Sequence, residues 1–382
     1  MEESCRKNHK MKKILFLIES LGGGGAEKVL SDIIQKLNKT KYDVTVCTVI
    51  DKGVYEPIVS ANSHCFSLLK TADYNAGGFK KAKYWFLQKA IYHLPKKAVY
   101  TLFIRNSYDV EVAFLEGFST SLIAASKNLK SKKIAWIHTS PLNLFRTNSN
   151  FKISDYKNMD LICCVAKSIE EELTTMCAEQ INTIVQYNPI DVNRILQLSE
   201  EPIELSSHPT LQLGTIGRLE TPKGFLRLID CLGKLQKLSI DYSLWIIGVG
   251  SQKGLLESTI KYYHLENKVV LLGFQDNPYK YLRKCDAFIC SSYVEGFSTA
   301  ATEAIILGKP VFTTDCSGMR ELFGTEKCGE IVDNNDEALL YMLKKILLKE
   351  WDPNKYIKGT TARSSSFDFS ARMSEIEHIL DQ

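Results

Sequence analysis

The sequence lacks the features that mark membrane, secreted and disulfide-rich proteins. No apolar run reaches the roughly 20 residues that a bilayer-spanning helix needs, and the polar leader, residues 1–10, lacks the apolar core of a secretory signal. The eleven cysteines show no C-x-x-C spacing, and the adjacent Cys163 and Cys164 lie within an apolar run, as small core residues do. We therefore expect a cytoplasmic protein without disulfides or structural zinc.

The 382 residues also contain no low-complexity tract and no detectable sequence repeat, and 45% are apolar against 24% charged. These values exclude a disordered or fibrous chain, and the length is typical of two domains of roughly 190 residues each. The net charge of +4 is unevenly distributed: residues 1–190 contain 26 lysines and arginines against 18 acids, and the remainder contains 22 against 26. The basic half is therefore the one expected to face an anionic partner.

Short apolar runs alternate with helix-compatible stretches along the first half of the chain. Alternation of this kind gives a parallel sheet covered by helices on both faces. We expect residues 1–190 to form one doubly wound, Rossmann-like domain. Its predicted strands are residues 12–19, 42–50, 109–116, 132–138, 160–165 and 182–187.

The same pattern restarts after a polar segment, residues 191–209, whose composition indicates a linker. A second domain is predicted over residues 210–365, and a last helix in residues 366–382 is expected to pack back across the first domain. The predicted fold class is α/β, with two doubly wound domains that face each other across a cleft, where such folds bind ligands. The predicted strands of the second domain are residues 211–217, 241–248, 267–273, 285–292 and 309–315.

The sequence EGFSTAATEA, residues 295–304, places two carboxylates on either side of a predicted helix start. A helix that opens near Phe297 or Ser298 directs free N–H groups and the positive end of its dipole at the cleft, which favours phosphate. Glu303 lies roughly 7 Å along this helix, Glu295 precedes it, and carboxylates accept hydrogen bonds from sugar hydroxyls. A nucleotide sugar satisfies all three features, although the two acids also fit an ordinary helix start and a solvated helix position.

The sequence GRLETPKG, residues 217–224, places two cations in a turn directly after a predicted strand. Arg218 and Lys223 can converge there on a diphosphate, and fixed positive charge stabilises oxygens that gain charge as a leaving group departs. Two exposed loop residues would show the same pattern. No paired-aspartate strand end that would hold a metal is evident, and we expect the chemistry to need none.

Weaker signals in the second domain point to the same cleft. Residues 248–250 form a Gly-x-Gly turn, which fits a tight turn as well as a ligand contact. Gly273 and Phe274 end another predicted strand at the same sheet edge, where backbone groups could contact a planar base.

Two signals come from the first domain. Glycines 22–25 lie at the first strand-to-helix turn, where glycine lets the backbone approach a ligand closely. His138 ends the predicted strand 132–138 and is expected to point to the cleft, although a histidine at a strand end also fits a structural role.

Residues 79–100 mix six lysines with aromatic residues and contain no acid. Basic segments with an apolar side lie on anionic membrane surfaces. A solvated helix with an ordinary apolar face has the same composition, so the sequence leaves both interpretations open.

Taken together, six elements resemble, in order along the chain, the large family of retaining glycosyltransferases with the GT-B fold, often called family 4. The resemblance covers nearly the whole chain, and the Gly-Gly-Ala-Glu start is similar to a subgroup that builds bacterial surface polysaccharides. The elements are GGGGAEKVL, WIH, GRLETPKG, GVGSQKGLLE, LLGFQDNPYKYL and EGFSTAATEAIILGKPVFTTDCSGMRE.

The resemblance implies roles for the matching positions. Arg218 and Lys223 would hold the donor diphosphate, Glu303 would bind ribose hydroxyls, and Glu295 and His138 would lie beside the transferred sugar. The other implied donor-binding residues are Gly23, Gly24, Gly217, Gly250, Gly273, Phe274, Gly296, Phe297, Ser298 and Thr299. Ser298 and Thr299 stand where the family often has Gly-Leu, which leaves the anion site intact but the selectivity for the donor sugar undefined.

The resemblance also implies the reaction. A hexose or N-acetylhexosamine would pass, with retention and without a metal or other cofactor, from a UDP-linked nucleotide sugar to a lipid-linked or free saccharide. The expected acceptor is a polyprenyl-diphosphate-linked oligosaccharide at the inner face of the cell membrane, in capsule, exopolysaccharide or O-antigen synthesis. No nucleic acid is expected as a partner.

Three other functions are compatible with parts of the pattern. A strand, a glycine loop, a helix and a second strand ending in Asp51 imitate the fingerprint of NAD-dependent oxidoreductases, although the third glycine of G-x-G-x-x-G is missing. A non-catalytic sugar-binding relative would keep the fold without transfer. A sugar-nucleotide epimerase would share the same architecture.

Overall fold

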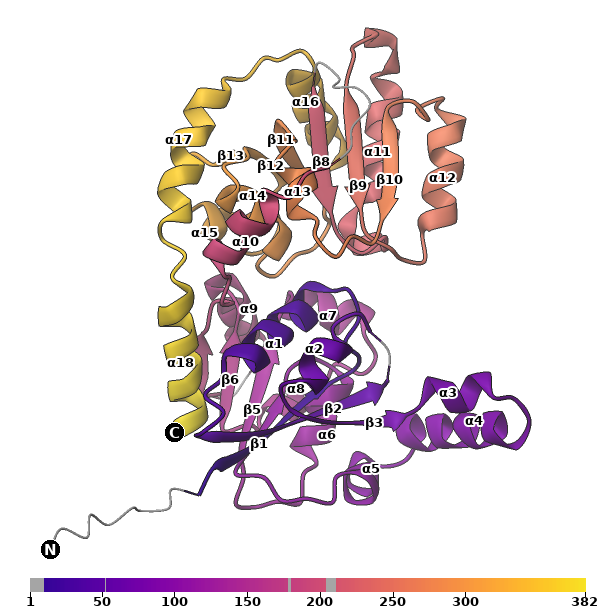
Figure 1. Ribbon diagram of the computed structural model, residues 1–382, viewed down its shortest axis with the longest axis vertical. Coiled ribbons are helices and arrows are strands. Elements are labelled where there is room, and N and C mark those ends of the chain that lie inside the picture. The colour runs from indigo at the N-terminus through magenta and orange to yellow at the C-terminus, as the bar shows by residue number, and fades with distance from the viewer. Residues whose placement is uncertain (1–9, 52, 178–179, 204–210) are drawn as a thin grey trace, which may run out of the picture.

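The computed structural model describes residues 10–51, 53–177, 180–203 and 211–382. They form two α/β domains stacked end to end, and two helices, α17 (Pro353–Ser364) and α18 (Phe369–Asp381), run along one side of both (Figure 1). Most of the expected leader, residues 1–9, and residues 204–209 of the expected linker lie outside the described residues.

The first domain contains a parallel sheet of seven strands in the order β3-β2-β1-β4-β5-β6-β7. Its strands are β1 Lys12–Ile18, β2 Tyr42–Ile50, β3 His64–Leu69, β4 Val110–Ala113, β5 Lys132–Ile137, β6 Leu161–Cys164 and β7 Thr183–Val185. Its helices are α1 Gly25–Lys36, α2 Glu56–Ser60, α3 Thr71–Asn75, α4 Gly78–His93, α5 Lys96–Phe103, α6 Phe118–Ala124, α7 Pro141–Thr147, α8 Ile153–Tyr156 and α9 Lys167–Met176.

The second domain contains a parallel sheet of six strands in the order β10-β9-β8-β11-β12-β13. Its strands are β8 Gln212–Ile216, β9 Ser243–Ile247, β10 Val269–Gly273, β11 Ala287–Cys290, β12 Val311–Thr314 and β13 Gly329–Val332. Its helices are α10 Val192–Ser199, α11 Phe225–Lys234, α12 Lys253–Tyr262, α13 Tyr279–Leu282, α14 Thr299–Ile306, α15 Met319–Phe323 and α16 Asp336–Leu347, with short 3-10 turns η1 Thr221–Lys223 and η2 Gln236–Leu238.

All eleven predicted strands are present, and the structure adds β3 and β13, which the sequence pattern did not indicate. Both lie at the edge of a sheet, where fewer apolar residues are buried and the pattern is weaker: no residue of β13 is fully buried. The predicted α/β fold with two doubly wound sheets is confirmed.

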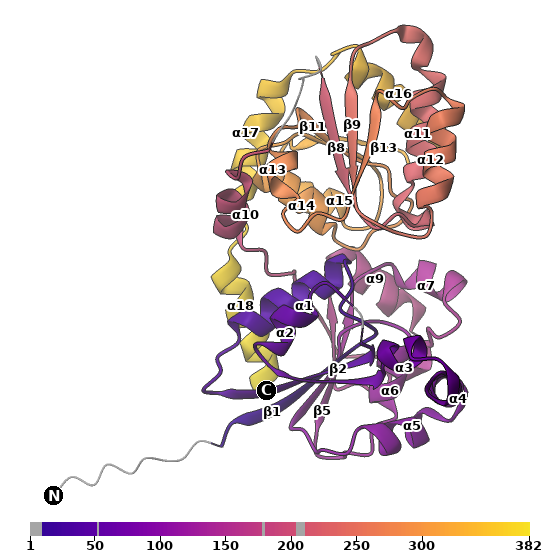
Figure 2. The same ribbon diagram turned by 45° about the vertical axis from the view of Figure 1, so that its right-hand side comes forward.

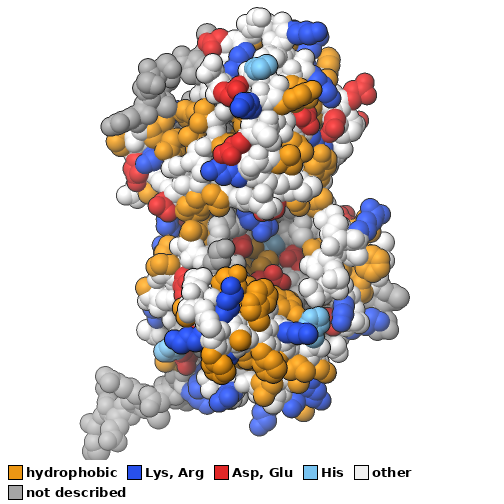
Figure 3. All heavy atoms as spheres, turned by 90° about the vertical axis from the view of Figure 1, so that its right-hand side faces the viewer, with side chains coloured by type: hydrophobic (Ala, Val, Ile, Leu, Met, Phe, Trp, Pro, Cys, Tyr) orange, Lys and Arg blue, Asp and Glu red, His pale blue; other side chains and the backbone are white. Residues whose placement is uncertain are grey.

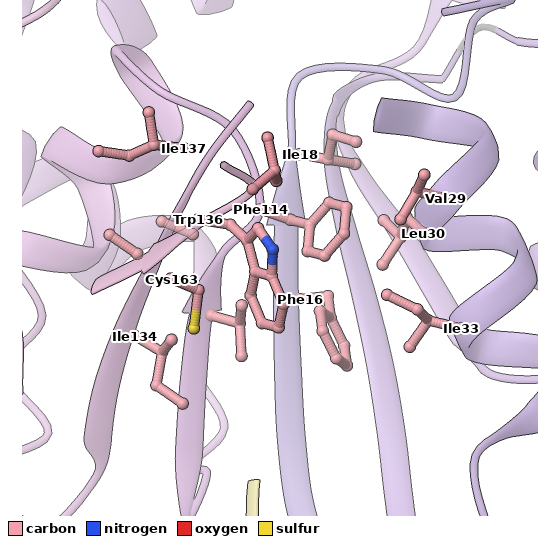
Figure 4. Close-up of a cluster of buried hydrophobic side chains, with 14 of the residues drawn as sticks. Phe16, Ile18, Val29, Leu30, Ile33, Phe114, Ile134, Trp136, Ile137 and Cys163 are labelled. Carbon is pink, nitrogen blue, oxygen red and sulfur yellow. The ribbon is translucent and has the colours of Figure 1, made fainter. Parts of the chain in front are cut away.

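The core of the first domain lies between its sheet and the covering helices. Strand β1 buries its last five side chains completely, because a central parallel strand is covered on both faces. Phe16 on this strand contacts Phe114, with ring centroids 6.0 Å apart, and Phe114 contacts Trp136 at 5.2 Å. Figure 4 shows these rings together with the apolar face of α1. This packing fixes the strand ends from which the site is built.

Part of the segment expected to be a linker is a helix. Helix α10 packs on α13, where the Asn277 side chain donates to the carbonyl of Leu198 at 2.7 Å. Its amphipathic spacing buries Ile195, so it is anchored to the second domain and is not an irregular connection.

The last helix lies against the first domain. Four apolar residues of α18 join the core of that domain, and the Tyr42 hydroxyl donates to Asp381 at 2.9 Å. On the opposite side, α3 and α4 project from the first domain (Figures 1 and 2).

Candidate active site

The strand order of each sheet reverses at one point, and the loops that follow the strands there face the other domain (Figure 1). The reversal lies between β1 and β4 in the first sheet and between β8 and β11 in the second. Open α/β sheets bind ligands beyond the carboxyl ends of the strands at such points. Glu19 and Glu116 follow β1 and β4, and Arg218 and Ser291 follow β8 and β11. The surface between the domains is hollowed, with charged side chains inside (Figure 3).

Close backbone contacts bring the first domain against the start of α14. Thr139 pairs with Gly296 in an isolated antiparallel bridge. A Cβ atom added at Gly296 would lie 1.9 Å from the carbonyl oxygen of His138, and one at Gly25 would lie 2.9 Å from Thr299 Oγ1. The structure therefore brings together three elements singled out in the sequence: the glycine loop, the strand end at His138 and the helix start.

Lys223 and Glu295 form an ion pair in the second domain. Lys223 Nζ lies 2.7 and 2.8 Å from the two carboxylate oxygens of Glu295, and Ser292 Oγ donates to Oε1 at 2.6 Å. The residue after the lysine, Gly224, lies in a turn that only glycine fits. Its φ is +65°, and the Ser291 carbonyl lies where a side chain would begin. Two residues that the sequence suggested for different parts of a ligand thus contact each other directly.

Arg227 holds the loop that carries Glu295. The guanidinium is 3% exposed and donates to the carbonyls of Ser291 at 2.7 Å and Ser292 at 2.6 Å, and to the Asn334 side chain at 2.8 Å. A buried cation with charge-assisted hydrogen bonds fixes backbone geometry strongly. Arg227 is therefore a positioning residue for the ion pair of Lys223 and Glu295.

Helix α14 begins where the sequence predicted. The Ser298 hydroxyl caps it by accepting from the N–H of Ala301 at 3.4 Å, and Thr299 is its first residue. The ring of Phe297 is buried 5.5 Å from that of Tyr187, so this side chain belongs to the packing between the domains. At Phe297 only the backbone can take part in the expected donor contact.

Glu303 lies in the second turn of α14 and faces the first domain. Its Oε1 atom contacts Lys28 Nζ, from α1, and accepts from the Tyr279 hydroxyl at 3.2 Å. The Lys28 ammonium also contacts the Tyr279 hydroxyl. The carboxylate that was expected to bind ribose therefore joins the two domains.

His138 ends β5 with its ring against that of Phe114, at a centroid distance of 4.9 Å. Burial lowers the pKa of His138 to about 3, so the imidazole is neutral at neutral pH. The buried Nε2 atom receives no hydrogen bond from the described part of the chain. A buried ring nitrogen of this kind can accept a hydrogen bond from a ligand hydroxyl.

Glu116 lies behind His138. Its carboxylate accepts from the main-chain N–H groups of His138 and Thr139, the latter at 3.0 Å. Burial raises the pKa of Glu116 to about 7, against those hydrogen bonds, which favour the charged form. Glu116 fixes the end of β5 and thereby the position of His138.

These two groups predict opposite effects of pH on stability. Folded Glu116 binds a proton up to pH 7 and the unfolded side chain only up to about 4.5, so the free energy of unfolding falls as pH rises between these values. Folded His138 loses its proton near pH 3 and the unfolded ring near 6.5, so its contribution rises with pH in that window. The two slopes cancel between pH 4.5 and 6.5.

We expect Glu116→Gln to remove the glutamate contribution to the pH dependence of the free energy of unfolding and to leave the His138 contribution. The variant should be more stable than the wild type at pH 8, by at most about 3 kcal/mol, because each pKa unit corresponds to about 1.4 kcal/mol. Urea unfolding followed between pH 5 and pH 8 measures this, with exposed Glu257→Gln as the control. An unchanged pH profile in Glu116→Gln would show that Glu116 does not carry the effect.

The glycine loop differs from the expected bare phosphate cradle. The Glu27 carboxylate folds over it, and a Cβ atom at Gly24 would lie 2.2 Å from Glu27 Oε2. A Cβ atom at Gly23 would lie 3.2 Å from the ring of Phe274 across the cleft. A side chain at Gly24 would therefore have to displace the Glu27 carboxylate, and an anionic ligand at this loop would have to lie beside that acid.

The remaining candidates surround the end of β8. Arg218 is exposed, and among the described residues its guanidinium forms no side-chain hydrogen bond or ion pair. Burial raises the pKa of the nearby Glu19, and the positive charge of Arg218 lowers it by a smaller amount. A Cβ atom at Gly217 would lie 3.3 Å from the Lys223 side chain, and one at Gly250 would lie 2.4 Å from the Leu219 carbonyl. Gly273 has a φ of +70°.

In the described ranges no group of three His, Cys, Asp or Glu residues is arranged to hold a metal ion.

The sequence interpretation missed four residues of this region: Lys28, Glu116, Arg227 and Tyr279. Lys28 and Tyr279 fall inside the quoted stretches GGGGAEKVL and LLGFQDNPYKYL, but neither sequence shows that the two side chains meet. Glu116 could have been suspected, because it is the last residue of the predicted strand 109–116, at the edge of the sheet where a ligand is expected.

Asp51 does not have the environment of a ribose-binding acid. Its carboxylate accepts from the N–H of Thr71 at 2.5 Å and so caps α3. This contact gives the residue a structural role, and among the described residues no hydrogen bond joins its carboxylate to the glycine loop, as the oxidoreductase alternative would favour.

The basic segment 79–100 forms two helices, α4 and α5, instead of one. Pro95 separates them, since it precedes α5 and cannot continue α4. Four aromatic side chains of α4 are exposed: Phe79 at 86%, Phe86 at 72%, Trp85 at 52% and Tyr92 at 37%. Of the helices in the described ranges, none is both long and apolar enough to cross a membrane.

Comparison with known proteins agrees with this geometry. The family model described as glycosyl transferases group 1 matches residues 200–363. A Campylobacter jejuni enzyme, N-acetylgalactosamine-N,N'-diacetylbacillosaminyl-diphospho-undecaprenol 4-alpha-N-acetylgalactosaminyltransferase, is 31% identical over 94% of this chain and 96% of its own. Among solved structures, Anabaena HepE in complex with UDP-glucose (TM-score 0.71, 20% identity, 97% of this chain and 99% of that one) shares the fold. So does Thermosynechococcus elongatus sucrose-phosphate synthase (TM-score 0.72, 16% identity, 97% and 98%).

Two Rossmann-like domains that meet at their strand ends define the GT-B architecture. The extent and identity of the match to the Campylobacter enzyme identify the group within it. The chain belongs to the GT-B glycosyltransferases.

Proposed function

We propose that the protein is a retaining glycosyltransferase that moves a hexose or N-acetylhexosamine from a UDP-linked sugar to a saccharide on a polyprenyl diphosphate. The observation that carries the proposal is the arrangement of Lys223, Glu295 and the start of α14 within one domain, opposite His138 of the other. The arrangement places positive charge and a carboxylate in one domain, and a ring nitrogen without a partner in the described chain in the other, where the two domains meet.

The donor diphosphate lies at the start of α14, where the N–H groups of Thr299 and the following residues are directed at the cleft. Lys223 and Arg218 supply the two cations. Because Lys223 also contacts Glu295, the diphosphate and the sugar hydroxyls bound by Glu295 are held in a fixed relation. The buried Nε2 of His138 accepts a hydrogen bond from a hydroxyl of the transferred sugar.

The acceptor hydroxyl attacks the anomeric carbon from the face that the diphosphate leaves. The new bond from the acceptor oxygen to this carbon forms as its bond to the diphosphate oxygen breaks, and a phosphate oxygen takes the proton of the hydroxyl. The anomeric configuration is retained. The protein contributes positioning and stabilisation of the charge that develops on the diphosphate.

The nature of donor and acceptor is supported by relatives. HepE was solved in complex with UDP-glucose, which supports a UDP-linked donor. The name of the Campylobacter enzyme describes an acceptor on diphospho-undecaprenol, which supports a lipid-linked saccharide. An Escherichia coli relative, lipopolysaccharide 1,6-galactosyltransferase, is 23% identical over 91% of this chain and supports a role in building surface polysaccharide.

A panel of nucleotide sugars tests the proposal. A ligand that binds only the folded protein raises its melting temperature, and a free concentration 100 times the Kd stabilises by about 2.7 kcal/mol. We expect one or more UDP-sugars to do this, and transfer to a polyprenyl-diphosphate saccharide to give an α- or β-linkage of the same configuration as the donor. Stabilisation by NAD and by no nucleotide sugar would overturn the proposal.

The acceptor lipid implies a membrane surface, and we place the contact on α4. Its lysines supply about 1 kcal/mol each on an anionic surface, and Phe79, Trp85 and Phe86 can enter the headgroup region.

We expect cosedimentation with phosphatidylglycerol vesicles at 50 mM salt, and loss of binding at 500 mM salt. The double variant Trp85→Ser, Phe86→Ser should bind weakly. Tyr262→Ser, at a 76% exposed aromatic residue of the second domain, is the control. Equal binding to neutral vesicles would contradict the prediction.

A further inference from the structure

The contact of Lys28 and Tyr279 with Glu303 crosses from one domain to the other at the site proposed for the donor ribose. We propose that Lys28 and Tyr279 are positioning residues that hold Oε1 of Glu303 so that Oε2 is presented to the ribose hydroxyls. This inference rests on the proposed function, because a ribose reaches Glu303 only if the protein binds a nucleotide sugar, as the family resemblance implies for this position. It adds a specificity element from the first domain to a binding site in the second.

The geometry of the three side chains carries the argument. Lys28 Nζ contacts both Glu303 Oε1 and the Tyr279 hydroxyl, which itself lies 3.2 Å from the same oxygen. The ammonium is also 5.0 Å from the centre of the Tyr279 ring. Both contacts to the Glu303 carboxylate use Oε1, so the lone pairs of Oε2 are left for another donor.

Burial makes this arrangement strong. The Glu303 side chain is 6% exposed and that of Lys28 is 25% exposed. Burial lowers the pKa of Lys28, but Glu303, Tyr279 and Asp32 together raise it well above its usual value, so the lysine stays charged. A carboxylate held between a half-buried cation and a hydroxyl has a fixed orientation, as a group that recognises a ribose must have.

The contact is part of a larger bridge between the domains. Asp32 follows Lys28 by one helical turn on α1, and its carboxylate lies 3.2 Å from Arg194 on α10 of the second domain. Helix α1 therefore meets the second domain through two ion pairs of opposite polarity. The Lys28 ion pair lies on Glu303, the proposed ribose ligand, and the Asp32 ion pair does not, which gives a matched pair of contacts to compare.

A purely structural role and the proposed role predict different results with a modified ligand. If Lys28 only joins the domains, its loss weakens the binding of every nucleotide equally. If Lys28 orients Glu303 toward the ribose, its loss removes the ability to distinguish UDP from 2′,3′-dideoxy-UDP, which lacks both hydroxyls. The ratio of the two dissociation constants is therefore the informative quantity.

The test is calorimetric titration of the wild type, Lys28→Met, Tyr279→Phe and Asp32→Asn with UDP and with 2′,3′-dideoxy-UDP. We expect the wild type to prefer UDP roughly 10- to 100-fold, as hydrogen bonds to a charged group give. Lys28→Met should reduce this preference to within about threefold, Tyr279→Phe should reduce it in part, and Lys28→Arg should restore it. Asp32→Asn should keep the wild-type ratio, even where its affinity for both ligands falls.

Each outcome has a separate meaning. If the wild type binds no UDP, the proposed function fails. If the wild type prefers UDP and Lys28→Met has the same preference, the proposed function stands and the inference about Lys28 is wrong. If the wild type binds both ligands equally, Glu303 does not contact the ribose, and the inference is wrong for that reason. Circular dichroism and melting curves establish that each variant is folded.

Discussion

Replacing Lys223 by alanine is expected to lower kcat by roughly 30- to 1000-fold, which corresponds to about 2–4 kcal/mol of transition-state stabilisation. The variant loses the cation proposed to hold the diphosphate. It also loses the group that orients the Glu295 carboxylate, because Lys223 Nζ lies within 2.8 Å of both of its oxygens. Steady-state transfer kinetics on a UDP-sugar measure the effect. The change should fall on kcat more than on KM, since the leaving group gains charge only as its bond breaks.

The matched control is Lys253→Ala, because Lys253 is an exposed lysine of the same domain in a surface ion pair with Glu257. We expect wild-type kinetics from this control. A folded Lys223→Ala variant with wild-type kcat would remove Lys223 from the site and, with it, the proposed source of leaving-group stabilisation.

Glu303→Ala and Glu295→Ala are expected to affect different steps. Glu303→Ala should weaken UDP binding roughly 10- to 100-fold, because a charged acceptor for ribose is lost. Glu295→Ala should leave UDP binding near the wild-type value and mainly reduce kcat, since Glu295 is proposed to hold the transferred sugar, which UDP lacks. UDP titrations together with transfer kinetics separate these two effects.

Glu303→Ala also removes the carboxylate that pairs with the half-buried Lys28 ammonium, which is itself costly. Glu303→Gln is therefore measured beside it, since glutamine keeps the size and one acceptor oxygen. Unfolding curves show whether either variant loses stability. Equal and mild effects of Glu303→Ala and Glu295→Ala on binding and turnover would contradict the two assignments.

The regular parts of this protein were predictable because they depend on local sequence. Strands such as β1 (Lys12–Ile18) are buried on both faces and therefore appear as continuous apolar runs. The start of α14 was equally clear, since Ser298 is a preferred capping residue before an apolar helix. Edge strands β3 and β13 and helix α10 were missed, because partial exposure and polar neighbours weaken the same signal.

The contacts of the candidate site were not predictable in the same way. Lys28 and Glu303 are 275 positions apart, and nothing in either local sequence indicates that one faces the other. The sequence suggested separate ligand contacts for Lys223 and Glu295, whereas the structure joins them in an ion pair. For the glycine loop, the sequence suggested open backbone, and the structure places the Glu27 carboxylate over Gly24.

The sequence alone therefore determined the α/β class and the two doubly wound sheets, and it predicts the edge of each sheet at which a ligand would bind. These properties follow from the period of apolar residues and from capping and turn residues, which act over a few positions. Only the tertiary structure decided which charged groups meet, which carboxylates are held and which buried nitrogen is left unpaired. Those properties depend on how the two sheets are placed against each other, because charged groups pair with whatever lies close in space rather than close in sequence.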